Sequence, residues 1–159
     1  MEEQTRNQVG RALGKIPSGG SVLTARHGER CTGMLISWVQ QASFEPPAIT
    51  VAVRHGRPIE ELIQASGHFV LNLIGEERGP MFKHFSRGFG PDEPAFHGLA
   101  IREIPQGIVL EECLAHLACR VIGSIDAGDH RVYVGEVVDG GLQVDGKPYV
   151  HLRSNGFRY

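Results

Sequence analysis

Short apolar runs separated by turn residues dominate the chain, and its 21 glycines fall between these runs. This spacing is typical of a turn-rich β protein. Tight turns at residues 27–30 and 127–129 indicate two hairpins. Alternating or continuous apolar residues predict strands at residues 21–26, 31–39, 48–53, 68–74, 113–126 and 130–139, with weaker strands near 98–103, 107–110 and 149–152.

Three segments carry helical signals instead. Apolar residues at helical spacing predict a helix over residues 4–16 and a short helix over residues 79–86. The clearest helix spans residues 58–67, because Pro58 suits the first helical position and Gly67 suits the C-terminal stop.

The expected strands outnumber the helices, and most neighbouring strands are joined by tight turns rather than by helical crossovers. No internal repeat, low-complexity tract or linker divides the chain. The sequence therefore predicts a single domain over residues 1–159 that is mainly β, a Greek-key barrel with flanking helices across its openings. A doubly wound α/β fold is disfavoured, because it requires helical crossovers.

A polar segment interrupts the apolar strand pattern at residues 36–43, which we call the ledge. It ends near the double proline Pro46-Pro47, which cannot donate backbone hydrogen bonds and forces an extended exit. Polar groups in a buried strand need partners, and a bound polar ligand is one such partner. The next strand, residues 49–53, runs into the basic loop of residues 54–57. This pairing suits a flat heteroaromatic ligand with a phosphate, and the alternative is a polar edge strand with a solvated basic turn.

The basic loop contains Arg54 and Arg57 and precedes the clearest helix. Helix N-termini favour anions, and an arginine binds phosphate through two parallel hydrogen bonds. Glu60 and Glu61 partly offset this positive field. Lys83 could add a second basic wall, although a solvated helix face is the simpler interpretation of its position.

The sequence Gly128-Asp129-His130 occupies a tight turn between two long strands. Glycine allows the sharp turn, and the aspartate can hydrogen-bond local backbone. The imidazole of His130 is therefore expected to be partly exposed at one end of the barrel. Two interpretations stay open: a plain turn residue, or a hydrogen-bonding or cationic group that faces a cofactor or a hydride donor.

The common catalytic signatures are missing from the sequence. It has no G-x-G-x-x-G after a strand, no P-loop and no G-x-S-x-G motif. Its eight histidines form neither H-x-H nor H-E-x-x-H, so no metal site is predicted. Cys31, Cys113 and Cys119 form neither a disulfide framework nor a C-x-x-C pair and are expected to be core residues.

Net charge and hydropathy limit the kinds of partner that the chain is expected to bind. A net charge of −2 argues against general nucleic-acid binding, and no apolar run is long enough to span a membrane. The acidic start Met1-Glu2-Glu3 argues against a signal peptide. With three unpaired cysteines, these features predict a reducing, cytoplasmic setting.

Several motifs occur in a characteristic order along about the whole chain: Gly33-Met34 through Pro46-Pro47, Val51 to Val53, Ser66 to Asn72, Leu110 with Leu114-Ala115 and Cys119, and Gly128-Asp129-His130. In this order they resemble the flavin reductase-like FMN-binding split-barrel family. The likeness is closest to the C-terminal flavin reductase module of flavodiiron proteins, which is also similar at Ser37 to Ser43, at Lys83-His84-Phe85 and at Arg153, Gly156 and Tyr159.

The resemblance implies a homodimer with FMN bound near the subunit interface. It places Arg54, Arg57 and Lys83 among the cofactor-binding residues, with the basic loop near the phosphate end. His130 is implied to lie near the flavin and the nicotinamide as the catalytic residue. Contact with the isoalloxazine, partly through main chain, is implied for the ledge: Ile36, Ser37, Trp38, Val39, Gln40, Gln41, Ala42 and Ser43.

The chain departs from the family where many members have small residues, because Leu35, Ile36 and Trp38 stand there instead. The function expected from the resemblance is an FMN-binding, NAD(P)H-dependent flavin reductase-like oxidoreductase that transfers hydride from nicotinamide to flavin. The alternative is an FMN electron-transfer flavoprotein that serves a redox protein partner without nicotinamide activity.

Overall fold

A computed structural model describes residues 1–77 and 79–158, so Tyr159 of the resemblance lies outside the described residues. Its helices are α1 (Glu3–Leu13), α2 (Ile59–Ser66) and α3 (Gly79–Ser86). The strands of the main sheet are β2 (Ser21–His27), β3 (Arg30–Ile36), β4 (Val39–Phe44), β5 (Pro47–Arg54), β6 (His68–Leu73), β9 (Ala115–Ala127) and β10 (His130–Leu142). Two small sheets pair β1 (Ser18–Gly19) with β11 (Val150–His151), and β7 (Ile101–Ile104) with β8 (Gly107–Leu110).

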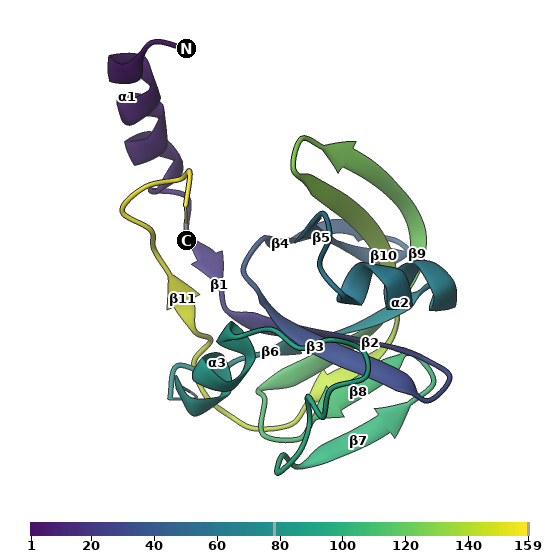
Figure 1. Ribbon diagram of the computed structural model, residues 1–159. Coiled ribbons are helices and arrows are strands. Elements are labelled where there is room, and N and C mark those ends of the chain that lie inside the picture. Colours follow the sequence, from purple (N-terminus) through teal and green to yellow (C-terminus); the bar gives the residue numbers. More distant parts are fainter. Residues whose placement is uncertain (78, 159) are drawn as a thin grey trace.

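The main sheet is antiparallel throughout, with the strand order β3-β2-β6-β9-β10-β5-β4. Its two edge strands, β3 and β4, follow one another in sequence, so the curled sheet is open between them (Figure 1). We call this opening the split. The expectation of a mainly β barrel with flanking helices is confirmed, and the split is the place where backbone groups of β3 lack a strand partner.

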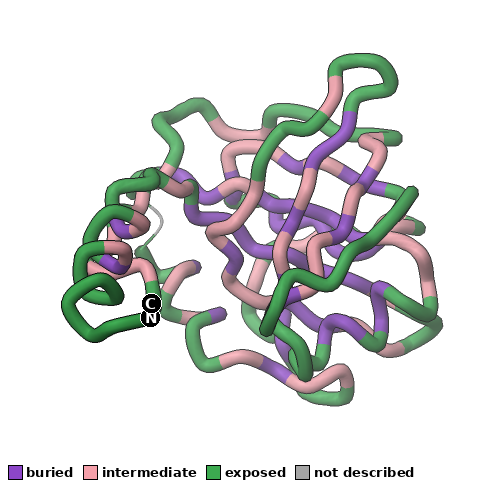
Figure 2. Tube along the Cα trace, turned by 90° about the horizontal axis from the view of Figure 1, so that it is seen from above, coloured by how far each residue is buried: buried purple, intermediate pink, exposed green. Residues whose placement is uncertain are grey.

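Two large apolar clusters cover the two faces of the strands, and a third, small cluster contains Val70, Val109 and Ala118. The inner one includes Leu23, Val51, Phe69 and Cys119, and α2 closes it with Ile59, Leu62 and Ile63. The outer one lies between the sheet, α3 and the loop that follows α3. The buried residues accordingly concentrate in the barrel body (Figure 2). Strand β6 is buried from Phe69 to Asn72, as its imperfect alternation predicts for a strand covered on both faces.

The expected strand over residues 31–39 is wrong in its extent. Strand β3 ends at Ile36, and the ledge continues as the separate strand β4, which pairs with β5 at the sheet edge. The exposed polar residues Gln40 and Gln41 can be solvated there, so this part of the ledge fits the alternative of a polar edge strand. The expected strand over residues 113–126 begins two residues later, at Ala115.

The N-terminal helix α1 projects from the barrel together with the C-terminal segment (Figure 1). The backbone N–H of Gly156 donates to the Gly10 carbonyl oxygen at 2.7 Å, and the guanidinium of Arg6 lies 4.4 Å from the Phe157 ring centre. We call α1 and residues 149–158 the arm. Across residues 1–77 and 79–158, no helix combines the length and the apolar character needed to cross a membrane.

Candidate functional site

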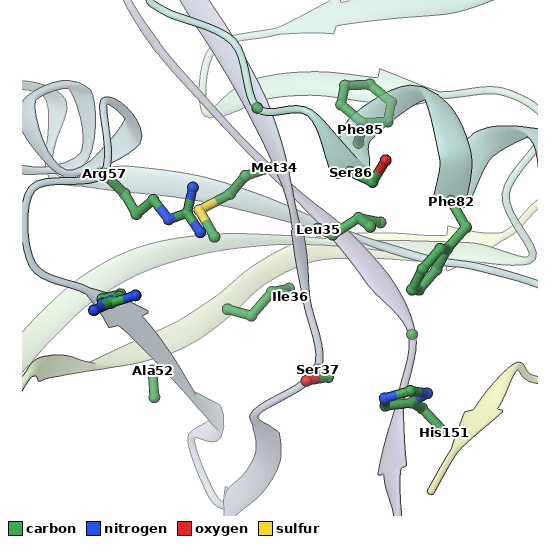
Figure 3. Close-up of a pocket in the computed structure, with 13 residues that line it drawn as sticks. Met34, Leu35, Ile36, Ser37, Ala52, Arg57, Phe82, Phe85, Ser86 and His151 are labelled. Atoms are coloured by element: carbon green, nitrogen blue, oxygen red, sulfur yellow. The ribbon is translucent and has the colours of Figure 1, made fainter. Parts of the chain in front are cut away.

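A pocket of about 340 Å³ lies at the split, which is within the size range of small-molecule sites. It brings together strand, loop and helix residues that are far apart in sequence (Figure 3). The lining residues are Gly20, Met34, Leu35, Ile36, Ser37, Ala52, Arg54, Arg57, Phe82, Phe85, Ser86, Gly88 and His151.

One side of the pocket is apolar. Met34, Leu35 and Ile36 come from the edge strand β3, and Phe82 and Phe85 come from α3 (Figure 3). Within residues 1–77 and 79–158, β3 pairs only with β2, so alternate backbone N–H and C=O groups along its other edge are available to a ligand. An apolar wall that also presents backbone donors and acceptors suits a flat heteroaromatic ring.

Close packing of α3 on β3 depends on Gly33. A Cβ atom built at this position would lie 2.9 Å from Cε1 of Phe85. Contacts this short do not occur between real side chains, so any larger residue would displace the phenyl ring from the pocket wall. Gly33 therefore sets the distance between β3 and α3, which together form the apolar side of the pocket.

The other side of the pocket is basic. Arg54 ends β5 and Arg57 follows it in the loop, and both line the pocket. The Arg54 guanidinium lies 4.0 Å from the Asp129 carboxylate, whereas no acidic side chain among residues 1–77 and 79–158 forms an ion pair with Arg57. His55 faces Glu60 instead, at 3.6 Å. Arg57 is thus the cation of this loop that is most available to a ligand anion.

The backbone donors of the loop just before α2 are already used. The N–H of Gly56 donates to the Glu60 carboxylate at 2.8 Å, the N–H of Arg57 donates to the Arg54 carbonyl oxygen, and Pro58 has no N–H. These loop donors are therefore not available to an anion, and in the first turn of α2 the N–H of Glu60 also donates to the Arg57 carbonyl oxygen. The side chains of Arg54 and Arg57 are the arginine cations that line this end of the pocket.

His130 lies beside the pocket but is not part of its lining. Its side chain is only 7% exposed, so the expectation of a partly exposed imidazole is wrong. The physical reason is Trp38, whose ring centre lies 4.6 Å from that of His130. The Nδ1–H of His130 donates to the Asp129 carboxylate at 2.7 Å, and this hydrogen bond lowers the pKa of Asp129. The strand register sets His130 opposite Arg54, which does line the pocket.

Apart from Trp38, the ledge residues divide into two groups. Ile36 and Ser37 line the pocket, whereas the residues of β4 do not: Val39, Gln40, Gln41, Ala42 and Ser43. Gln40, Gln41 and Ala42 are exposed on the edge strand, and Lys83 is exposed on α3 away from the pocket lining. In a single chain, the ledge contributes to the pocket through its first two residues.

Sequence reasoning missed several lining residues. In the sequence, Phe82 and Phe85 look like core positions of a short helix. In the structure, Phe85 is part of the outer cluster and Phe82 packs against it, and both residues also line the pocket. His151 comes from the short strand β11 and has no local motif that marks it. Only the folding of the C-terminal segment against the split brings His151 to the site, so no sequence signal was available.

The cysteines and histidines form no second chemical centre in the part of the chain that the structure describes. No group of three or more His, Cys, Asp or Glu side chains there could hold a metal ion. All three cysteines are free, and burial raises the pKa of the Cys119 thiol to about 12. A thiol with so high a pKa is a poor nucleophile at neutral pH.

The chain is similar to known flavoproteins along nearly its full length. A family model described as "Flavin reductase like domain" matches residues 13–158. A diflavin flavoprotein A of Nostoc sp. is 41% identical over 155 residues, which are 95% of this chain. The chain spans 27% of the length of that relative.

Solved structures share the fold. The NADH:FAD oxidoreductase SgcE6 of Streptomyces globisporus C-1027 superposes with a TM-score of 0.84 at 21% identity, over 98% of this chain and 93% of that one. The flavin reductase of styrene monooxygenase from Pseudomonas putida S12 has a TM-score of 0.77 at 25% identity, over 91% of each chain. On the family match and the identity to its relative, the chain belongs to the flavin reductase-like domain family.

Proposed function

We propose that the protein binds FMN at the split and uses NAD(P)H to reduce it. The observation that carries this proposal is the division of one pocket into an apolar wall, from β3 and α3, and a basic end with Arg54 and Arg57. An isoalloxazine ring fits the first and a terminal phosphate fits the second. The chemistry of these side chains therefore matches the two halves of FMN.

FMN is preferred over FAD in this proposal because the pocket has one short basic end. Arg54 and Arg57 are three residues apart, which suits a single phosphate, and the chain has no dinucleotide fingerprint. The solved structure of SgcE6, which shares this fold, is named an NADH:FAD oxidoreductase, and this name refers to SgcE6 alone. Comparing the affinities for FMN, FAD and riboflavin therefore tests the phosphate argument directly.

Bound FMN would supply the hydride acceptor, and the residues around the split would bind and orient it. Arg57 and Arg54 would hold the phosphate. The side chains of Met34 and Phe82 would exclude water from the ring, and free backbone groups along β3 would hydrogen-bond its polar edge. His130 would help to place the nicotinamide or offset charge that develops on the reduced ring.

A homodimer is part of the proposal. The β4 edge is unpaired in one chain, and the Phe44 side chain at its end is 89% exposed. Ile16, Val150 and Leu152 of the arm and its junction with the barrel are also largely exposed. A second copy that covers these surfaces would bring β4 residues of the ledge closer to a flavin. Sedimentation of the FMN-loaded protein tests this, and a monomer with full FMN occupancy would contradict it.

A second candidate function is an FMN electron carrier that passes electrons to a redox protein. It is favoured by one observation: the chain matches about a quarter of the length of its diflavin flavoprotein relative. In both cases we propose a reducing, cytoplasmic setting, since the three cysteines are free.

The visible spectrum of the purified protein, followed by anaerobic addition of NADH and then NADPH, separates these functions. A yellow protein that bleaches with a nicotinamide supports the reductase. A yellow protein that bleaches only with a chemical reductant supports the carrier. A colourless protein that takes up no flavin would overturn both.

A further inference from the structure

Trp38 is the only tryptophan in the chain, and its ring does not line the pocket. Its neighbours Ile36 and Ser37 do. The Trp38 ring instead packs on His130, with a centre-to-centre distance of 4.6 Å and an angle of 42° between the ring planes. The side chain is therefore directed away from the space where a flavin would bind and toward the imidazole.

Two further contacts hold Trp38 in this place. Its carbonyl oxygen accepts a hydrogen bond from the backbone N–H of Ala52 at 3.0 Å, which ties the residue to β5. The guanidinium carbon of Arg153, from the arm, lies 5.2 Å from the centre of its ring. This is within the range of a cation–π interaction. Trp38 is therefore restrained both at its backbone and at its ring.

The imidazole of His130 needs more than one restraint. Asp129 accepts a hydrogen bond from Nδ1–H and so fixes which nitrogen carries the proton in the neutral ring. One hydrogen bond does not fix the ring plane. Packing against the indole supplies that second restraint, because the indole occupies space into which the imidazole would otherwise turn.

We propose that Trp38 is a positioning residue for His130 rather than a residue that contacts the flavin. Its indole holds the imidazole in the plane from which His130 acts on the flavin–nicotinamide complex. This inference rests on the proposed function. It differs from what the resemblance implies for one ledge residue, because it gives the Trp38 side chain a partner other than the isoalloxazine.

Kinetics on the FMN-loaded protein give the first test. Trp38→Ala is expected to slow flavin reduction at saturating nicotinamide by roughly tenfold while it changes FMN affinity less than about twofold, and Trp38→Phe should restore most of the rate. In the His130→Ala background, Trp38→Ala should have little further effect, because residues that act as one unit are not additive. Equal losses in FMN affinity and rate, or fully additive effects, would overturn the proposal.

Fluorescence of the flavin-free protein gives the second test, independent of activity. The indole packs on the imidazole with ring centres 4.6 Å apart, so removal of the imidazole changes the surroundings of the ring. The intensity and the wavelength of Trp38 emission should therefore change in His130→Ala, and they should stay as in wild type in Arg102→Ala, whose side chain pairs with Glu111. Emission that is identical in His130→Ala and in wild type would contradict the contact.

The two tests separate this inference from the proposed function. A wild-type protein that binds FMN but is not reduced by either nicotinamide would overturn the reductase proposal and, with it, the catalytic purpose of the contact. A reducible protein in which Trp38→Ala leaves the rate unchanged would overturn only the positioning role.

Discussion

The backbone N–H of Ala52 donates to the carbonyl oxygen of Trp38 at 3.0 Å, and this hydrogen bond extends the pairing of β4 with β5 by one residue. This hydrogen bond ties the junction of β3 and β4 to β5. It sets Ser37 beside the end of β5, so that Ser37, Ala52 and Arg54 line the same pocket. The apolar wall and the basic end of the site are thereby held at a fixed separation.

Arg57→Ala should weaken FMN binding about 10- to 100-fold, because a hydrogen bond to a charged group contributes about 1.5–3 kcal/mol. Riboflavin binding should change much less, because riboflavin lacks the phosphate. Arg102→Ala is the matched control, since Arg102 lies on β7 outside the pocket, where its side chain pairs with Glu111. Lys83→Ala should also have a smaller effect than Arg57→Ala. Equal losses of FMN and riboflavin affinity in Arg57→Ala would refute a phosphate role.

His130→Ala should leave FMN affinity nearly intact and slow flavin reduction by about tenfold or more, equivalent to about 1.4 kcal/mol of transition-state binding. His130→Asn should recover part of the rate if hydrogen bonding matters, and little if positive charge matters. Stopped-flow reduction with NADH and with NADPH measures both variants. An unchanged rate with both donors would make His130 a structural residue of the turn.

Gly33→Ala should lower the free energy of unfolding by about 1–3 kcal/mol, because the new methyl group meets Phe85 at 2.9 Å in a packed core. Gly123→Ala is the control, since a Cβ atom there meets nothing within 4 Å. Urea denaturation of both variants measures the difference. Equal stability of the two would show that α3 moves freely relative to β3.

The hydrogen bond from His130 lowers the pKa of Asp129 below its ordinary value of about 3.8. Between the two values the unfolded chain binds more protons, so stability rises with pH in this window. The contribution is present above about pH 3.8 and is lost as the pH falls through the folded-state pKa. Asp129→Asn should therefore be less stable than wild type at neutral pH, with a smaller loss below about pH 4. Parallel acid-unfolding curves would contradict this.

The sequence predicted the fold from strong local signals, such as the apolar alternation of the hairpins and Gly67, which takes the left-handed conformation at the end of α2. It did not predict that the ledge would break at Ser37, because that break depends on pairing with β5. It singled out Arg54 and Arg57, which line the pocket, but it did not predict that the Glu60 carboxylate accepts a hydrogen bond from the backbone N–H of Gly56. The burial of His130 under Trp38 and the arrival of His151 likewise depend on contacts between distant segments.

The most direct test of the account is anaerobic stopped-flow mixing of the FMN-loaded protein with NADH and, separately, with NADPH. We predict that the absorbance of oxidised flavin is lost with at least one donor at a rate that saturates with its concentration, within the usual enzymatic range of about 1 to 1000 per second. Flavin that stays oxidised with both donors, yet is reduced by dithionite, would contradict the account.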